Sequence, residues 1–458
     1  EMTKWAFDLS EKLLLPVILR PTTRTCHACQ DVVMPAEQKE RRKASGFVKS
    51  PDWVIFPSLS ARKHPWLNRQ QEEARQIFEQ SDFNQLILQE DSDVGIIACG
   101  VSYNYVREAL ELSGLKSSVL KIGTPYPLPA GPVLELFKHA GKILVIEEQE
   151  PVVEDQVISL AWQHRSAVRI SGKNDRLVPR EGEFNVDKVK TFIERFFGIK
   201  SAAREPALVP ELPLRPPVLC AGCPHRASFY IFREAAKGKD VVFTGDIGCY
   251  TLGAMPPLNT TDTCLCMGAS ITIATGLNRV EPDRKQVAFL GDSTFFHTGI
   301  PGLINAVYNR ADITVVILDN STTAMTGHQP HPGLGRTAMG TAGTQVDIAK
   351  LVRACGVEFV REVDPYDLKT AGEAAGAALS HPGPAVVIMK RECVALVKKG
   401  LPYLVDHDSC VDCGVCMEEL GCPAIGRSSS GPEISASCAG CGVCAQICPA
   451  GAIVEVRS

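Results

Sequence analysis

Short apolar runs alternate with longer amphipathic segments through residues 90–200. The pattern predicts strands at 94–100, 118–122 and 142–146, and helices at about 103–113 and 133–140. Buried strands that alternate with helices are typical of a parallel sheet covered by helices on both faces. We therefore expect an α/β domain over this part of the chain.

The same alternation returns over residues 218–400. Strands are predicted at about 241–244, 286–290, 314–318 and 385–389, and helices near 269–276 and 302–309. Between the two stretches, residues 201–217 contain five prolines, which block helix formation and favour extended backbone. We predict a second, larger α/β domain beyond a proline-rich linker.

The start of the chain is less regular. An apolar run at 13–19 is predicted to be a strand, although too few residues precede it to complete a sheet. We therefore expect residues 1–36 to be the remnant of a larger domain. Residues 37–89, rich in charged side chains and interrupted by prolines, are predicted to form a solvated, partly helical connector.

Eight of the 18 cysteines lie in the last 49 residues, in two C-x-x-C-x-x-C runs that each end in a Cys-Pro pair. This spacing is typical of two [4Fe-4S] clusters in which the fourth thiolate of each comes from the other run. We call the expected ligands the first tail set (Cys410, Cys413, Cys416, Cys448) and the second tail set (Cys438, Cys441, Cys444, Cys422). Residues 401–458 are predicted to form a ferredoxin-like domain. The alternative is a zinc-binding or disulfide-linked tail, which leaves the two Cys-Pro closures unexplained.

Composition narrows the class of partner. The 48 Lys and Arg residues against 52 Asp and Glu give a net charge of −4, without the basic stripe expected of a nucleic-acid-binding protein. No apolar run is long enough to span a bilayer. Free thiols and oxygen-labile clusters favour a reducing compartment, so we expect a cytoplasmic protein without membrane or nucleic-acid contacts.

Polar side chains follow two neighbouring strands of the second domain. Gly291-Asp292-Ser293 ends one strand and Asp319-Asn320-Ser321-Thr322 ends the next. Oxygen ligands at the carboxyl ends of adjacent parallel strands can hold Mg²⁺ on a diphosphate, and Gly291 would let the phosphate approach the backbone. The alternative is an ordinary pair of strand-end turns.

These residues carry a family resemblance. Gly291-Asp292-Ser293 with Leu318-Asp319-Asn320 resembles the thiamine-diphosphate motif of transketolase-like enzymes. Together with Cys220-Ala-Gly-Cys223-Pro-His225 and the two-cluster tail, it resembles the 2-oxoacid:ferredoxin oxidoreductases, and the resemblance covers essentially the whole chain. Residues 322–329 are similar to the cofactor loop of that family.

The resemblance implies roles for particular residues. Asp292 and Asn320 would bind Mg²⁺ through their side chains and Thr322 through its carbonyl, while Met325 and Thr326 would face the cofactor and substrate. Met325 packing in a core is the simpler alternative. His225 and His328 would flank the site and bind phosphate or the substrate carboxylate, and His225 would be one of the catalytic residues with Met325 and Thr326. The alternative for each histidine is a hydrogen-bonded loop residue. The remaining cofactor-binding residues would be Gly248, Cys249, Gly268, Gly291 and Ser293.

Four further cysteines lie at intervals similar to those that hold a cluster beside the cofactor in ferredoxin-dependent relatives. We call them the inner set: Cys220, Cys223, Cys249 and Cys393. A third [4Fe-4S] cluster is the hypothesis. Free buried thiols are the alternative, because cysteine is among the most buried residue types.

The resemblance further implies an activity and its partners. The expected reaction is oxidative decarboxylation of an aryl, indolepyruvate-like 2-oxoacid to the acyl-CoA, with electrons passing to ferredoxin. The expected assembly is a hetero-oligomer with a smaller beta subunit. Residues 1–36 would be the remnant of the pyrimidine-binding domain, and residues 90–200 would correspond to the transketolase carboxyl-terminal domain. The alternatives are pyruvate or another aliphatic 2-oxoacid as substrate, or a non-catalytic electron-transfer subunit with a degenerate cofactor site.

Overall fold

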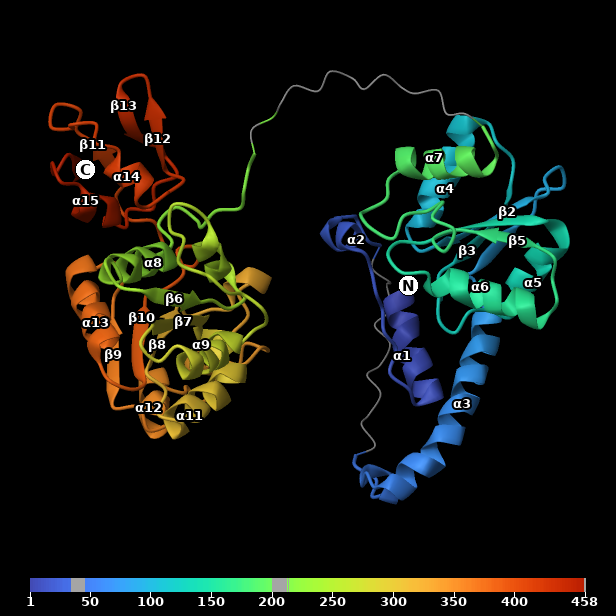
Figure 1. Cartoon of the computed structure of the whole chain (residues 1–458), viewed down its shortest axis with the longest axis horizontal. Coiled ribbons are helices and arrows are strands. Elements are labelled where there is room, and N and C mark those ends of the chain that lie inside the picture. The colour runs from blue at the N-terminus through green and yellow to red at the C-terminus, as the bar shows by residue number, and fades with distance from the viewer. Residues whose placement is uncertain (34–45, 200–211, 213, 457–458) are drawn as a thin grey trace. The chain divides into compact units, whose positions relative to one another are not determined.

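A computed structural model describes residues 1–33, 46–199, 212 and 214–456. The chain divides into two compact units, Glu1–Pro210 and Glu211–Ser458, each with its own core (Figure 1). Most of the predicted proline-rich linker, and residues 37–45 of the predicted connector, lie outside the described residues. The described part of that connector is dominated by the long helix α3 (Pro57–Glu79).

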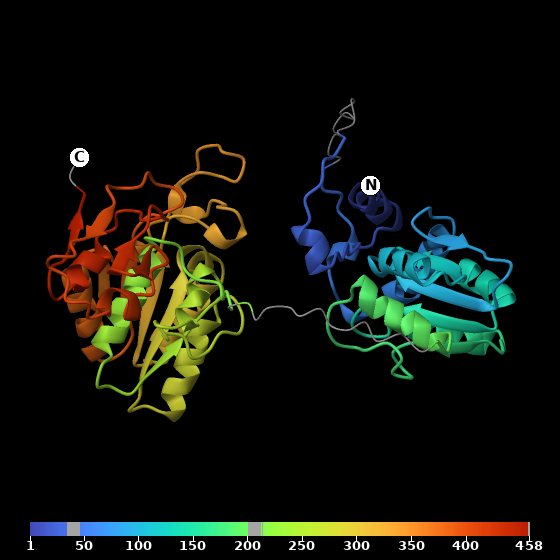
Figure 2. The same ribbon diagram turned by 90° about the horizontal axis from the view of Figure 1, so that it is seen from above.

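The first unit is built on a five-stranded sheet in the order β1-β3-β2-β4-β5. Its strands are β1 (Gln85–Ile87), β2 (Val94–Cys99), β3 (Ser118–Ile122), β4 (Lys142–Ile146) and β5 (Arg169–Ser171). The sheet lies between two helical layers (Figure 2): α4 (Ser102–Ser113) and α7 (Val186–Phe196) on one face, α5 (Ala130–His139) and α6 (Val152–Gln163) on the other. Only β1 runs antiparallel. The predicted α/β architecture is confirmed here.

The predicted strand at 13–19 is wrong. Residues before it form helix α1 (Met2–Leu13), which ends where Leu14 adopts a left-handed conformation, and no strand follows it at 14–19. Leu9 and Leu13 lie four residues apart and so share one face of the helix, which packs against Phe78 of α3. The leucines that suggested a strand are in part the buried stripe of an amphipathic helix.

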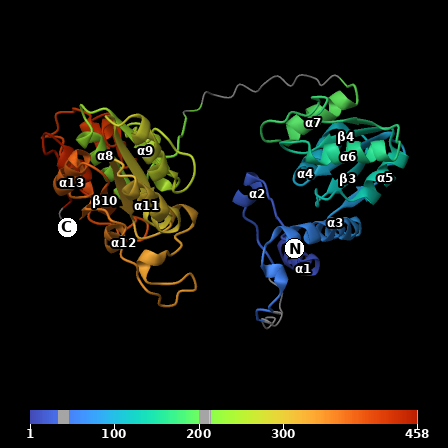
Figure 3. The same cartoon turned by 60° about the horizontal axis from the view of Figure 1, so that its bottom comes forward.

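The second unit contains a fully parallel sheet in the order β6-β7-β8-β10-β9. The strands are β6 (Val241–Thr244), β7 (Lys285–Gly291), β8 (Ile313–Asp319), β9 (Phe359–Val363) and β10 (Ala385–Lys390). Helices α8 (Pro224–Ala235) and α13 (Leu368–Ser380) cover one face, and α9 (Ala269–Val280), α11 (Ile300–Tyr308) and α12 (Ile348–Ala354) cover the other (Figure 3). The predicted second α/β architecture is also confirmed.

The register of this sheet brings two loops together. Gly291, the last residue of β7, pairs with Leu318 of β8, so that Asp292 and Asp319 both emerge at the carboxyl edge of the sheet. Hydrophobic residues fill both faces behind this edge, among them Phe289 on one side and Leu290 on the other. The edge is the place where an open parallel sheet binds ligands.

The C-terminal part of the second unit is small and rich in turns. Its elements are β11 (Tyr403–Val405), α14 (Val415–Glu418), β12 (Ile425–Ser428), β13 (Gly431–Ile434), α15 (Val443–Ile447) and β14 (Ile453–Glu455). The two short helices each follow a C-x-x-C turn and begin after a glycine with a left-handed backbone, Gly414 and Gly442. This repeated turn and helix gives the tail its ferredoxin-like fold.

Across the described ranges, no helix combines the length and the apolar character needed to cross a lipid bilayer.

Candidate active site

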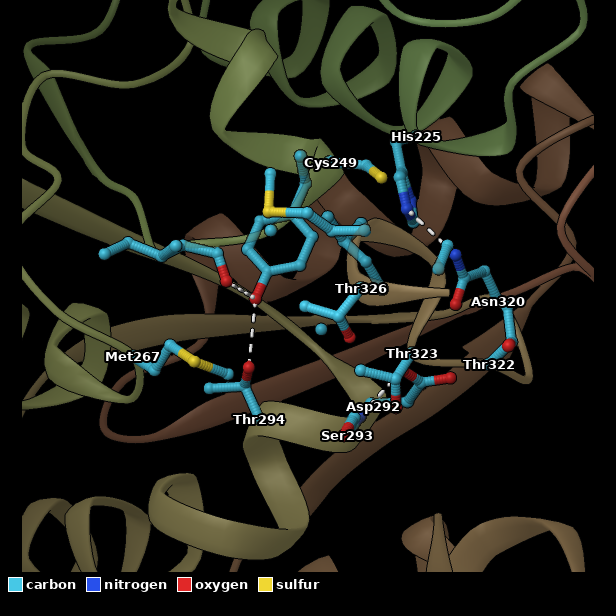
Figure 4. A pocket seen from close by; sticks show the side chains of 17 residues that line it. His225, Cys249, Met267, Asp292, Ser293, Thr294, Asn320, Thr322, Thr323 and Thr326 are labelled. Carbon is cyan, nitrogen blue, oxygen red and sulfur yellow. Dashed lines mark hydrogen bonds between the residues drawn. The ribbon is translucent and has the colours of Figure 1, made fainter. Parts of the chain in front are cut away.

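A pocket of about 600 Å³, its open mouth included, lies at the carboxyl ends of β6, β7 and β8 (Figure 4). Ten of the predicted site residues line it: His225, Gly248, Cys249, Gly291, Asp292, Ser293, Asn320, Thr322, Met325 and Thr326. Three segments distant in sequence, at His225, at residues 247–250 and at Met267, therefore converge with the ends of β7 and β8 on one cavity.

Asp292 is buried, with only 2% of its surface exposed, and both oxygens of its carboxylate have a hydrogen-bond partner. One oxygen accepts a hydrogen bond from the Ser293 amide at 2.7 Å, and the other lies 3.1 Å from Nε2 of the buried His331. The amide of Gly333 donates to Nδ1 of His331 at 3.2 Å, which leaves the ring proton on Nε2. His331 therefore donates to Asp292 and fixes the orientation of its carboxylate.

A second histidine orients Asn320. The Asn320 side-chain nitrogen lies 3.3 Å from Nε2 of His225, and an amide nitrogen can only donate, so Nε2 of His225 accepts. Burial lowers the pKa of His225 to about 4, which keeps the ring neutral and able to accept at ordinary pH. The amide oxygen of Asn320 is left available for a cation.

A second carboxyl group, Asp319, accompanies Asp292. Burial first, and then the charge of Asp292, raises the pKa of Asp319 to about 6. Among the described residues, neither carboxylate forms an ion pair with a lysine or arginine within 4 Å. Two neighbouring buried carboxylates without a lysine or arginine in contact suit a divalent cation, which prefers carboxylate and amide oxygens.

The walls of the pocket also suit a bound diphosphate. The hydroxyl of Thr322 is buried and has no hydrogen-bond partner among the described residues. A Cβ atom added at Gly291 would come within 2.6 Å of the Tyr250 ring, and one added at Gly248 within 2.3 Å. Tyr250 is itself fixed by hydrogen bonds to the Ile247 carbonyl and the Thr294 hydroxyl. An unsatisfied hydroxyl and bare backbone beside the carboxylates fit a magnesium diphosphate.

Asp246 joins the loop after β6 to the start of α9. Its side chain accepts hydrogen bonds from the amides of Ile247 and Gly268, both at 2.7 Å, and from the Ser270 hydroxyl at 3.2 Å. Burial raises the pKa of Asp246, although these hydrogen bonds oppose that effect. Gly268 itself does not line the pocket, whereas its neighbour Met267 does. Gly268 thus contributes to the site through the position of its backbone.

We predict that Gly268→Ala destabilises the chain. Gly268 has φ of +88°, and an added Cβ would lie 2.2 Å from the Thr298 hydroxyl oxygen, so both strain and a clash result. The expected loss is roughly 1–3 kcal/mol in the free energy of unfolding, measured by urea titration. The control is Gly276→Ala in the same helix, where nothing lies within 4 Å and a gain of about 0.5–1 kcal/mol is expected. Equal losses in the two variants would contradict the assignment.

The loop after Asn320 carries the exposed part of the site. Met325 lines the pocket and is 55% exposed, so it does not pack in a core. Thr326 donates from its hydroxyl to the Gln329 side chain at 2.7 Å, and Gln329 donates back to the Thr326 carbonyl at 2.6 Å. His328 lies in the same loop but does not line the pocket, and its Nδ1 is buried without a partner among the described residues.

The inner set of cysteines borders the pocket. Cys249 lines it, and the amide of Cys393 donates to the Asn320 carbonyl at 2.9 Å. Burial raises the pKa of Cys249, and the nearby Cys393 and Cys220 raise it further. Burial likewise raises the pKa of Cys223 to about 12, with a smaller contribution from Cys220. Four cysteines separated by up to 173 positions thus gather in one neighbourhood beside Asn320.

The tail cysteines lie in two groups. Four of them, the first tail set, line one small pocket: Cys410, Cys413, Cys416 and Cys448. A second pocket is lined by Cys422, Cys441 and Cys444, and Cys438 lies close enough to raise the pKa of Cys444. Within the described residues, no three His, Cys, Asp or Glu side chains converge on a single metal ion. A cubane cluster instead needs thiolates spread around four irons.

Sequence reasoning missed several residues that shape this site. His331 and Tyr250 act through contacts with Asp292 and Thr294 that no local pattern encodes. Asp246, in the turn Thr244-Gly245-Asp246-Ile247-Gly248, follows a strand and was open to detection by the same logic as Asp292.

A family model described as the thiamine pyrophosphate enzyme C-terminal TPP-binding domain matches residues 246–389, which include the pocket edge of β7 and β8. The indolepyruvate oxidoreductase subunit IorA of Pyrococcus horikoshii is 42% identical, with 100% of this chain and 76% of that protein covered. IorA of Methanothermobacter marburgensis is also 42% identical, with 99% and 74% covered.

More distant matches are shorter. The 2-oxoglutarate synthase subunit KorB of Archaeoglobus fulgidus is 30% identical over 39% of this chain and 70% of that protein. Among solved structures, a 2-oxoglutarate:ferredoxin oxidoreductase from Magnetococcus marinus, with 2-oxoglutarate, coenzyme A and succinyl-CoA bound, matches with 22% identity and a TM-score of 0.35. It covers 40% of this chain and 65% of that one.

Proposed function

This chain belongs to the family of IorA subunits of indolepyruvate oxidoreductase, and we propose that it oxidatively decarboxylates an aryl 2-oxoacid such as indolepyruvate to the acyl-CoA. As a member of this family it is a thiamine-diphosphate-dependent oxidoreductase. The observation that carries the proposal is the pocket at the carboxyl edge of the second sheet, where Asp292 and Asn320 lie beside Cys249. The binding site for a magnesium diphosphate and the binding site for an electron acceptor would then be adjacent.

Thiamine diphosphate, when bound, supplies the carbanion chemistry and accepts the electrons of decarboxylation. The side chains of Asp292 and Asn320 and the carbonyl of Thr322 would hold its Mg²⁺. The backbone around Gly248 and Gly291 would approach the diphosphate, with Ser293 and Gly268 close by. Met325 and Thr326 would meet the reactive end and the substrate, and His225 would orient Asn320 through the hydrogen bond at 3.3 Å.

Three iron-sulfur clusters would carry the electrons away. The inner set lies beside Asn320, and Cys223 also lines the pocket of the second tail set. Of the first tail set, Cys413 is exposed. These contacts support electron transfer from the inner set to the second tail set and then to the first tail set. An external ferredoxin would be the final acceptor.

A partner chain is part of the proposal. The pyrimidine ring of thiamine diphosphate requires a carboxylate to promote its activation, and among the described residues no glutamate lines the pocket. A smaller beta subunit or further residues of the polypeptide would supply this group. All 18 cysteines fall within the described residues and none forms a disulfide, in keeping with a reducing, cytoplasmic location.

Substrate-dependent reduction of a viologen dye tests the proposal. The anaerobically purified chain, with its partner subunit, coenzyme A, thiamine diphosphate and Mg²⁺, would be assayed with indolepyruvate, phenylpyruvate, pyruvate and 2-oxoglutarate. We expect the highest kcat/KM with the two aryl substrates. A preference for pyruvate would change the proposed substrate but not the proposed reaction. Absence of dye reduction with all four 2-oxoacids, despite bound thiamine diphosphate, would refute the proposed activity.

We predict that His331→Ala weakens magnesium binding. Without the Nε2 donor the Asp292 carboxylate loses its fixed orientation, and loss of such an outer contact typically costs about 10–100-fold in metal affinity. Calorimetric titration of Mg²⁺ in the presence of thiamine diphosphate measures the effect. His331→Gln, which keeps a donor, should recover part of the affinity. An unchanged affinity in the alanine variant would contradict the role of His331.

A further inference from the structure

Arg226 is a buried arginine whose charge has no carboxylate partner among the described residues. Its side chain donates to three backbone carbonyls: Leu420 at 2.7 Å, Gly421 at 2.7 Å and Leu219 at 2.6 Å. Its Nε has no partner within the described part of the chain. A buried guanidinium without a counter-charge is costly, so a negative group is expected nearby.

The three carbonyls belong to two loops that carry expected cluster ligands. Leu219 immediately precedes Cys220, and Leu420 and Gly421 immediately precede Cys422. Arg226 therefore ties the loop of the inner set to the loop that presents one ligand of the second tail set. Its side chain also lines the second tail pocket, together with Cys422, Cys441 and Cys444.

The surroundings of Arg226 support a role in electrostatics rather than helix stability. Arg226 lies in the first turn of α8, where a positive charge is unfavourable to the helix dipole. Burial lowers the pKa of its guanidinium, and the charges that would oppose this effect are those of Cys422, Cys223, Cys441 and Cys220 once ionised, largest first. Cysteines of two sets, all of them expected cluster ligands, are thus the groups whose negative charge would act most on Arg226.

We propose that Arg226, which lines a pocket with three of the four cysteines of the second tail set, raises the reduction potential of the cluster on that set more than that of the inner cluster. It would so favour the electron step from the inner cluster to the second tail cluster. The inference rests on the proposed function, because it requires both clusters. In that step one electron would leave the inner cluster, which would be oxidised, and would enter the second tail cluster, which would be reduced. No atom is transferred, and the electron then leaves through the first tail cluster to the external acceptor. A fixed positive charge stabilises the added negative charge, because net charge and hydrogen bonding set cluster potentials.

Arg226→Gln tests the proposal in the full complex. Potentials of all three clusters would be measured by redox titration followed by electron paramagnetic resonance, with iron and thiamine diphosphate content determined on the same samples. We expect the second tail cluster to become harder to reduce by at least tenfold in its one-electron equilibrium constant, which corresponds to about 59 mV. The potential of the first tail cluster, which lacks contact with Arg226, should change less.

Arg233 provides the matched control. It lies two turns along the same helix and also reaches the tail, but it forms an ion pair with Glu419 and donates to the Glu419 carbonyl at 3.1 Å. Arg233→Gln removes an equal charge that is already compensated, so we expect no selective shift of the second tail cluster. Equal potentials in the Arg226 and Arg233 variants, with full iron content, would overturn the proposal.

Arg226→Lys covers the case in which the glutamine variant fails to assemble the cluster. It keeps the charge while it loses the planar fork that meets three carbonyls. A potential close to the wild-type value would support the proposal, whereas a tenfold shift despite the retained charge would overturn it. If the wild-type complex itself contained no iron, the proposed function would fail. A normal wild-type complex with an unshifted Arg226→Gln variant would instead sink this inference alone.

Discussion

Asp292→Asn is expected to abolish thiamine-diphosphate-dependent activity while the apoprotein stays folded. The substitution removes the carboxylate that the Ser293 amide and His331 hold at the position proposed for Mg²⁺. Removal of one member of a buried charge pair costs about 3–5 kcal/mol, which is more than a hundredfold in affinity. Calorimetric titration with thiamine diphosphate and Mg²⁺, together with viologen reduction, measures the loss.

The same variant should leave the apoprotein equally or more stable, because the charge of Asp292 opposes ionisation of Asp319. In the metal-free wild-type chain the pKa of Asp319 is raised from 3.8 to about 6. A raised carboxyl pKa means that the folded state binds the proton more tightly, so its stabilising effect is complete below pH 3.8 and is lost as the pH rises to about 6. Burial is the larger cause of the raised pKa and the charge of Asp292 the next, so Asp292→Asn should flatten this part of the stability curve only in part.

Asp283→Asn serves as the control, because Asp283 is exposed and lies in the turn before β7, at the opposite edge of the sheet. Neither its cofactor affinity nor its turnover should change. Retention of wild-type cofactor affinity in Asp292→Asn would refute the magnesium site and with it the assignment of the pocket.

Cys249→Ala is expected to remove electron transfer but not cofactor binding. Three [4Fe-4S] clusters correspond to about twelve irons per chain, and loss of the inner cluster would leave about eight. Because Cys249 lines the pocket at its border with Cys393, the first acceptor would be missing and viologen reduction should fall by at least a hundredfold. Iron analysis, thiamine diphosphate titration and the dye assay on one preparation separate these effects.

Cys264→Ala is the matched control for that experiment. Cys264 is an exposed cysteine of the same region, close to the Asp246 carbonyl, and belongs to none of the three sets. Its variant should keep about twelve irons and full activity. A wild-type chain with only about eight irons, or a Cys249 variant with all of its iron and activity, would exclude an inner cluster.

Much of the architecture follows from the sequence because the signals are local. The strands at 118–122 and 142–146 have the bounds expected from their apolar runs, since a strand buried on both faces has few polar positions to interrupt it. The strands that were missed are short or lie at sheet edges, such as β1 and β5, where three residues provide too little pattern. The incorrect strand at 13–19 arose because a run of leucines does not by itself distinguish a strand from a helical stripe.

The residues of the site likewise include some that local sequence patterns reveal and others that they do not. Asp292 and Asn320 are recognisable because each follows a buried strand, and parallel strands bring their carboxyl ends to one edge. The tail cysteines are recognisable because cluster ligation fixes the spacing within one loop. By contrast, the contact of His331 with Asp292 joins positions 39 apart, and that of Arg226 with the carbonyls before Cys422 spans nearly 200 residues.

The sequence by itself determined the parallel α/β class, the cysteine-rich tail and the residue types able to hold a magnesium diphosphate, because periodicity and ligand spacing are properties of neighbouring residues. Only the tertiary structure decided which histidine orients Asp292, that Cys393 lies beside Asn320, and that an uncompensated arginine lies between two cysteine sets. Such contacts depend on the register of β7 against β8 and on the packing of α8 against the tail. Packing between distant segments places a charge in a low-dielectric interior, and no local pattern encodes that placement.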